Sequence, residues 1–229
     1  MKTNDDLIRR AEVHAALGDP TRLAIVDELS VSDRSPGELA AHFDVPANLL
    51  AHHLDVLEEA GLIERFISRG DRRRRYVRLA GPLPVGGPSR IDLDGRSVLF
   101  VCTHNSARSQ LAAAMWNDRV PHAPASSAGT EPAARVHPRA IQAAKRRGLD
   151  LTSAVPTRAD PAELEQPLAE RLVITVCDRA HEELNPSDDW LHWSIDDPVE
   201  HDSATAFNRA ADDIDTRITH LISQGTSTT

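Results

Sequence analysis

The feature that most constrains the fold is an apolar run that ends in a cysteine and a short polar loop. Residues 98–101 are all apolar, Cys102 follows, and residues 110–116 carry apolar side chains at helical spacing. The pattern predicts a buried strand, a tight loop and the N-terminus of a helix. Such a turn directs backbone N–H groups and the positive end of a helix dipole into one concavity, which predicts an anion site.

Cys102 is placed at the rim of this predicted anion site. The same N–H groups and the guanidinium of Arg108 would stabilise its thiolate, so Cys102 is a candidate nucleophile toward a tetrahedral oxyanion. The alternative is a structural cysteine at a strand-to-helix turn. An arginine six residues after the cysteine, followed directly by Ser109, favours the catalytic interpretation.

The motif Cys-x5-Arg-Ser after a strand resembles the signature of the low-molecular-weight tyrosine phosphatases and of the arsenate reductases that share their fold. The resemblance covers about residues 95–223. It implies that Cys102 is the nucleophile and that Arg108 clamps the oxyanion through two hydrogen bonds. It further implies that Asn105 braces the loop, that Ser109 hydrogen-bonds the thiolate, and that Asp197, directly before a proline, is the general acid. The implied oxyanion loop comprises Thr103, His104, Asn105, Ser106, Ala107 and Arg108.

The residues after the Asp-Pro pair bear on the reaction. Tyrosine phosphatases of this fold usually have aromatic residues there, but residues 199–202 read Val-Glu-His-Asp. Residues 193–198, with Phe207 further on, resemble the arsenate reductase tail. The resemblance therefore favours an arsenate reductase, for which phosphate is a substrate analogue. The alternatives are a low-molecular-weight (tyrosine) phosphatase and an oxyanion-sensing transcriptional repressor.

The source of the second thiol is a separate question, because the chain has two cysteines, Cys102 and Cys177. Thioredoxin-coupled reductases use two further cysteines, and Cys177 matches the first of them, but Leu184 stands at the expected place of the second. Ala107 replaces the second cysteine of the phosphatase loop. We therefore expect no bound cofactor or metal and an external reductant: mycothiol or glutathione with a glutaredoxin-type partner, or thioredoxin. Cys177 is either a redox partner of Cys102 or a buried cysteine at a strand end.

The first third of the chain predicts helices followed by a basic hairpin, which is the order of a winged helix-turn-helix. Helices are expected over residues 5–17, from Pro20, from a capping box of Ser35 and Glu38, and from Pro46. Two strands are expected over residues 62–68 and 74–79, around a turn at residues 70–71.

Residues 17–22 (Leu-Gly-Asp-Pro-Thr-Arg) and 52–62 resemble ArsR-type winged-helix repressors. The resemblance implies DNA binding as a homodimer, with the fourth helix in the major groove. Adjacent helical residues point in different directions, so we expect one of His52 and His53 to face the core. A solvated hairpin tip is the alternative reading of the arginines. The candidate DNA contacts are Asn48, His52, His53, Arg69, Arg72, Arg73, Arg74 and Arg75.

The later strands and helices alternate, which predicts an α/β class with a parallel sheet in the second domain. Further strands are expected over residues 125–130, where a short strand ends in a turn, and over 172–176, with an edge strand at 193–195. We expect a winged-helix domain over residues 1–80, a Pro/Gly linker over 81–93 and the phosphatase-like domain over 94–225. The net charge of −9 argues against a general polyanion binder. The polar N-terminus and the lack of a long apolar span predict a cytoplasmic protein without membrane contact.

Overall fold

The computed structural model describes residues 2–81, 93, 95–166 and 170–225, and it divides into an N-terminal and a C-terminal compact unit. Most of the predicted linker, residues 82–92, lies outside the described residues, so the bounds 1–80, 81–93 and 94–225 remain predictions. In the described part of the chain, no helix is long and apolar enough to cross a membrane.

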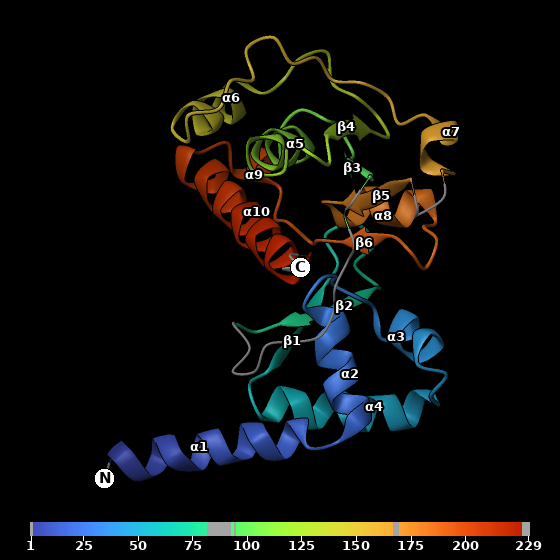
Figure 1. Ribbon diagram of the computed structural model, residues 1–229, viewed down its shortest axis with the longest axis vertical. Helices are drawn as coiled ribbons and strands as arrows, with labels where there is room; N and C mark the ends of the chain where they lie inside the picture. The colour runs from blue at the N-terminus through green and yellow to red at the C-terminus, as the bar shows by residue number, and fades with distance from the viewer. Residues whose placement is uncertain (1, 82–92, 94, 167–169, 226–229) are drawn as a thin grey trace. The chain divides into compact units, whose positions relative to one another are not determined.

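The N-terminal unit has the predicted order of helices and hairpin, drawn in blue to green in Figure 1. Asp19 begins the second helix by accepting a hydrogen bond from the backbone N–H of Arg22 at 3.0 Å. Ser35 and Glu38 form the predicted capping box at the third helix. The elements are α1 (Lys2–Leu17), α2 (Pro20–Leu29), α3 (Pro36–His42), α4 (Ala47–Glu59), β1 (Ile63–Ile67) and β2 (Arg75–Leu79).

The core of this unit is aliphatic, and the apolar side chains at the beginning of α1 contribute little to it. Leu7 and Ile8 are 61% and 49% exposed, and among the early apolar residues of α1 only Val13 is partly buried. β1 and β2 pair in antiparallel register from Ile63 opposite Leu79 onward. The fully buried side chains of the core include Ile25, Val26, Leu39, Leu50, Leu54 and Leu57.

The C-terminal unit is a four-stranded, wholly parallel sheet with the strand order β4-β3-β5-β6. This confirms the predicted α/β class. Its elements are β3 (Ser97–Cys102), α5 (Arg108–Arg119), β4 (Ala125–Gly129), α6 (Pro138–Lys145), α7 (Pro161–Leu164), β5 (Arg171–Thr175), α8 (Asp178–Leu184), β6 (Leu191–His192), α9 (Pro198–His201) and α10 (Ala204–Gly225).

Helices cover the sheet because β3 and β5 are apolar on both faces. Within this unit α5, α6 and α10 pack together, and α5 also contacts β3 and β4 (Figure 1). The apolar face of α10 is buried as its spacing predicts, at Phe207, Ala211, Ile214, Ile218 and Leu221.

The predicted edge strand lies one step away from its expected place. The strand that pairs with β5 is β6 at Leu191–His192. The N–H of Trp193 still donates to the carbonyl oxygen of Thr175 at 2.8 Å, and the buried chain then leaves the sheet. The apolar side chains of Trp193 and Ile195 are buried in the core beyond the end of the strand, and an apolar run does not distinguish such burial from sheet pairing.

Candidate active site

The loop between β3 and α5 is built around the backbone of Asn105. This residue has a φ of +46°, in the left-handed region that Asn tolerates better than most residues. The turn brings the Asn105 N–H to 3.2 Å from the Sγ of Cys102. Ala107, which precedes the first helical residue, provides no side-chain cap, so the first N–H groups of α5 have no partner from it. The loop therefore has the N–H-rich form that the sequence predicts.

Ser109 lies against the cysteine. Its Oγ is 3.0 Å from the Sγ of Cys102, and both residues are buried. The side-chain amide of Asn105 donates to the same Oγ at 2.8 Å and to Ser127 at 2.9 Å. Because Asn105 is the donor to the Ser109 oxygen, the Ser109 hydroxyl hydrogen is available to the sulfur. The contact expected from the family resemblance is thus present.

The other side of the Asn105 side chain is held by residues that the sequence did not indicate. Its Oδ1 accepts hydrogen bonds from Nε2 of Gln110 at 3.0 Å and from the N–H of Thr157 at 2.8 Å. Thr157 and Ser127 come from segments far along the chain, so no local pattern could identify them. Both N–H donors and both acceptor positions of the Asn105 side-chain amide are therefore occupied, which fixes its orientation.

The end of β4 passes close to the loop, and a glycine makes this approach possible. A Cβ at Gly129 would lie 2.6 Å from the carbonyl oxygen of Thr103 and 2.9 Å from the backbone nitrogen of Asn105. Both neighbours are backbone atoms and cannot rotate away. Gly129 therefore lets the two segments lie side by side.

Arg108 is buried, at 7% exposure, and its guanidinium is fixed at two atoms. Nη1 donates to the carbonyl oxygen of Ile195 at 3.0 Å, and Nη2 donates to Oδ2 of Asp197 at 2.6 Å. Burial opposes the charge of Arg108, but the nearby Cys177, Asp197 and Cys102 outweigh it and raise its pKa further above its ordinary value. Arg108 is a permanent cation at the mouth of the loop.

Asp197 also begins α9. Its Oδ1 accepts from the N–H of Val199 at 3.0 Å, while its Oδ2 contacts Arg108. The structure thus brings together all five predicted catalytic residues: Cys102, Asn105, Arg108, Ser109 and Asp197.

Cys177 lies below the loop at the start of α8 and is not bonded to Cys102. Its Sγ accepts from the N–H of Ala180 at 3.4 Å and lies 3.4 Å from Oγ1 of Thr103. Burial raises the pKa of the Cys177 thiol; Arg108 counteracts this in part, and the charge of Cys102 adds to it. Cys177 is therefore a neutral thiol at neutral pH.

A buried polar cluster that the sequence did not indicate follows Cys177. His192 and His181 stack with ring centroids 4.1 Å apart, and Thr175 Oγ1 contacts the Nδ1 of each at 2.9 and 2.8 Å. Nε2 of His192 is 3.1 Å from Oδ1 of Asp178. Burial raises the pKa of Asp178, but the hydrogen bond and charge of His192 and the hydroxyl of Ser194 lower it from 3.8 to about 2. Asp178 is thus an anion held by its neighbours.

A cavity of about 660 Å³ opens beside the oxyanion loop. The loop contributes His104 and Ser106 to its lining, and the segment before α6 contributes Arg135 and His137. Among the described residues that line it there is no Phe, Tyr or Trp.

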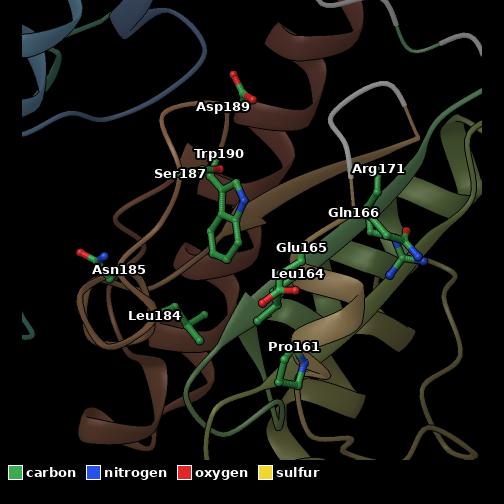
Figure 2. A pocket seen from close by; sticks show the side chains of 10 residues that line it. All are labelled: Pro161, Leu164, Glu165, Gln166, Arg171, Leu184, Asn185, Ser187, Asp189 and Trp190. Carbon is green, nitrogen blue, oxygen red and sulfur yellow. The ribbon is translucent and has the colours of Figure 1, made fainter.

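A second cavity, of about 610 Å³, lies between α7, the end of α8 and the chain before β6. Figure 2 shows Trp190 and Leu184 at this cavity together with Pro161 and Leu164 of α7. Its lining contains no residue of the oxyanion loop. Leu184, which stands where a third redox cysteine was expected, therefore faces this separate cavity.

In the N-terminal unit, the candidate DNA contacts differ in exposure. Asn48 and His52 on α4 are exposed, and so are residues 72–75 of the hairpin. Arg69 is exposed as well, but it belongs to the C-terminal unit, where its guanidinium lies 2.9 Å from Oδ1 of Asp196. His53 is 7% exposed and its Nδ1 lies 3.8 Å from Asp19. His53 is therefore the core-facing member of the histidine pair, and its burial speaks against the predicted DNA contact.

Comparisons with known proteins divide the chain in the same two parts. Residues 97–227 match the family model described as low molecular weight phosphotyrosine protein phosphatase, and residues 17–65 match a helix-turn-helix domain model. Arsenate reductase 2 of Staphylococcus epidermidis is 34% identical over 131 residues, which cover 55% of this chain and 95% of the relative. The uncharacterized HTH-type transcriptional regulator YceK of Bacillus subtilis is 40% identical over 81 residues, covering 34% and 77%.

Solved structures give the same fold for the C-terminal unit. A low molecular weight protein tyrosine phosphatase from T. tengcongensis aligns with a TM-score of 0.51 at 20% identity, covering 56% of this chain and 98% of that one. At this identity the likeness establishes the fold alone. Because the phosphatase family model spans more than half of the 229 residues, the chain belongs to the low molecular weight phosphotyrosine protein phosphatase family, with a helix-turn-helix domain ahead of the family domain.

Proposed function

We propose that the C-terminal unit is a thiol-dependent arsenate reductase and that the N-terminal winged helix regulates transcription in the arsenic response. The observation that carries the enzymatic part is the cavity beside the oxyanion loop, to which the loop contributes His104 and Ser106. Its described lining offers no aromatic side chain to pack on a phosphotyrosine ring, whereas arsenate is a small tetrahedral anion that needs none. The 34% identity to an arsenate reductase over nearly that protein's whole length supports the same choice.

The first chemical step uses the residues at the oxyanion loop. The Cys102 thiolate, which accepts hydrogen bonds from Asn105 N–H and Ser109, attacks the arsenic atom of arsenate. An arsenic–oxygen bond breaks, and the departing oxygen takes a proton from Asp197 and leaves as water. The guanidinium of Arg108 and the N–H groups of the loop hold the remaining oxygens.

The second step needs another thiol, and the structure favours an external one. Cys177 is a neutral, buried thiol, which makes it a poor nucleophile. An external thiolate instead attacks Sγ of Cys102. The sulfur–arsenic bond breaks, its electron pair remains on arsenic, and arsenite leaves while a mixed disulfide forms on Cys102. A second thiol, or a glutaredoxin-type partner, then releases the Cys102 thiolate.

The experiment is arsenite production from arsenate by the purified full chain. Thioredoxin with its reductase, glutathione with glutaredoxin, and mycothiol with mycoredoxin are supplied in separate assays. Turnover with at least one system, lost in Cys102→Ser, is the expected result. Arsenite production that persists unchanged in Cys102→Ser, or none with any donor, contradicts the proposal.

A phosphatase is the second candidate function, and the family membership favours it. The same Cys102, Arg108 and Asp197 would form a phosphocysteine intermediate and protonate the leaving oxygen of a phosphoester. Hydrolysis of an aryl phosphate by the full chain, without arsenite production from arsenate, would establish this reaction in place of arsenate reduction.

For the winged helix we propose DNA binding as a homodimer. α4 exposes Asn48 and His52, which can hydrogen-bond base edges, and the exposed arginines of the hairpin suit phosphate contacts. Leu7 and Ile8 expose apolar surface on α1 and are our candidates for the dimer contact. A gel-shift assay with DNA from upstream of the protein's own gene tests the binding. Replacing Arg72 and Arg74 by Ala should weaken binding uniformly and flatten its salt dependence.

The gel-shift assay also distinguishes the reductase from the alternative in which the C-terminal unit makes the protein an oxyanion-sensing repressor. DNA affinity that changes when arsenate is added, in a protein with no measurable turnover, indicates an oxyanion sensor.

Light scattering of the Leu7→Asp variant tests the dimer, which should dissociate to a monomer. A dimer that persists in this variant contradicts the α1 contact.

A further inference from the structure

A positively charged wall lies beside the oxyanion loop. The cavity of about 660 Å³ is lined by Arg135, Arg139 and His137, by His104 of the loop, and by Asp202. Its volume suits a small organic ligand, whereas arsenate alone would fill a minor part of it. In a chain whose net charge is −9, a cationic cavity at the mouth of the site indicates an anionic ligand.

The charges in this wall are not all neutralised from within. Asp202 accepts from Nε of Arg139 at 2.8 Å and lies 3.5 Å from Nε2 of His137. Arg135 is exposed, and within the described residues its guanidinium makes no hydrogen bond or ion pair. The lining thus has one carboxylate for two arginines, and the guanidinium of Arg135 remains available to a ligand.

Backbone hydrogen bonds fix this wall to the oxyanion loop. The N–H groups of residues 130, 131, 133 and 137 donate to the carbonyl oxygens of residues 102, 103, 104 and 106, at 2.8 to 3.2 Å. The segment that contains Arg135 therefore runs along the loop that contains Cys102. The stacking of His137 on Phe207, with centroids 4.8 Å apart, holds the end of the segment against α10.

We propose that this cavity binds the reductant, a low-molecular-weight thiol that carries a carboxylate, with Arg135 as its carboxylate contact. The inference rests on the proposed arsenate reduction and adds to it the chemical class of the thiol. Glutathione and γ-glutamylcysteine carry a thiol and carboxylates on one short flexible backbone. The backbone bonds place the segment of Arg135 along the loop that begins at Cys102, so a thiol whose carboxylate binds Arg135 is held beside that loop. From there its sulfur would perform the displacement of arsenite described above. Mycothiol carries no carboxylate and does not fit this requirement.

The test compares two thiols that differ in the carboxylates alone. Arsenate reduction is measured with glutathione and with glutathione diethyl ester, with the other conditions identical. In the unchanged protein the KM for glutathione should be about tenfold below that for the ester, as expected for one charge-assisted contact. Added salt should raise the KM for glutathione and leave that for the ester unchanged.

The matched variants are Arg135→Glu and Arg209→Glu. Both replace an exposed arginine of the C-terminal unit, but Arg209 lies on α10 and does not line the cavity. In Arg135→Glu the KM for glutathione should rise about tenfold while the KM for arsenate stays within about twofold. Equal KM values for glutathione and its ester, or the same rise in Arg209→Glu, would overturn the proposal.

A binding measurement separates this inference from the proposed reaction. S-methylglutathione keeps both carboxylates but cannot react, and its binding to the full chain can be followed by NMR or calorimetry without arsenate. Binding that Arg135→Glu weakens supports the site even if the chain proves unable to reduce arsenate. Arsenate reduction without any binding of S-methylglutathione overturns the site and leaves the reductase intact.

Discussion

Nη2 of Arg108 lies 2.6 Å from Oδ2 of Asp197, so the proposed oxyanion clamp is paired with the proposed general acid. Both groups hold their places through further contacts, Arg108 to the carbonyl of Ile195 and Asp197 to the N–H of Val199. An oxyanion entering the loop therefore competes with Asp197 for the guanidinium. Binding and proton transfer are linked through this one ion pair.

The Asp197→Asn variant should separate the two effects. Asn keeps an acceptor for the N–H of Val199, so α9 should form as before. We expect the kcat of arsenate reduction to fall about a hundredfold, because the general acid is lost. Phosphate, measured as a competitive inhibitor, should bind several-fold more tightly because Arg108 loses its anionic partner. Asp196→Asn is the control and should change neither value. A lower kcat with weaker phosphate binding would contradict the linkage.

Substitutions of Asn105 should distinguish backbone geometry from side-chain bonding. Asn105→Gly and Asn105→Ala both lose the hydrogen bonds to Ser109, Ser127, Gln110 and Thr157, so both should lower kcat by at least about tenfold. Ala must also adopt a φ of +46°, so the unfolding free energy of Asn105→Ala should be about 1 kcal/mol lower than that of Asn105→Gly. Urea unfolding and steady-state kinetics on the same preparations check this. Equal stability of the two variants would show that the loop relaxes to another backbone conformation.

Asp178 should make stability depend on acid pH. Its folded-state pKa of about 2 lies below the ordinary 3.8, so its stabilisation is complete above pH 3.8 and is lost as the pH falls toward 2. Asp178→Asn should lower the unfolding free energy by about 2 kcal/mol at neutral pH. The difference should shrink as the pH falls below 3.8 and approach zero below about pH 2.

Tryptophan fluorescence is suited to this measurement, because Trp116, Trp190 and Trp193 all belong to the C-terminal unit. Asp118→Asn on α5, an exposed position, is the control and should change the unfolding free energy by less than about 0.5 kcal/mol. A difference between Asp178→Asn and the unchanged protein that stays constant from pH 7 to pH 3 would argue against the carboxylate of Asp178 as its source.

Cys177→Ser tests whether the second cysteine is needed. Serine is a good N-cap, so it should replace the hydrogen bond that Cys177 accepts from Ala180 and allow α8 to form. With an external thiol, we expect the kcat of arsenate reduction to stay within about twofold, because the buried neutral thiol is not the nucleophile. Loss of turnover in a protein with an unchanged thermal midpoint would instead establish an internal cysteine relay.

The parts of the site that the sequence predicted are local. Cys102, Asn105, Arg108 and Ser109 lie within eight consecutive residues, and the strand–loop–helix pattern that brackets them is set by short-range preferences. The caps at Asp19 and Ser35 were predicted on the same basis. Asp197 required the family resemblance, because an Asp-Pro pair is an ordinary turn as well.

What the sequence missed depends on distant contacts. Ser127 and Thr157 brace Asn105 from 22 and 52 residues away, and no periodicity marks a hydrogen bond of that span. His181 and His192 were equally invisible, because a histidine in a core has no pattern of its own. Burial likewise decided between His52 and His53, which the sequence could only divide into one inward and one outward residue.

The main-chain pairing of residues 130–137 with the oxyanion loop has an evolutionary consequence. These contacts use main-chain atoms that every residue except proline supplies, so a mutation in this segment can change a side chain at the mouth of the site without moving the catalytic cysteine. Gly129, where a Cβ would collide with the loop, and His137, which stacks on Phe207, are constrained, whereas an exposed position such as Arg135 is open to drift. A lineage could therefore exchange one small thiol for another through a few substitutions here and keep its chemistry throughout.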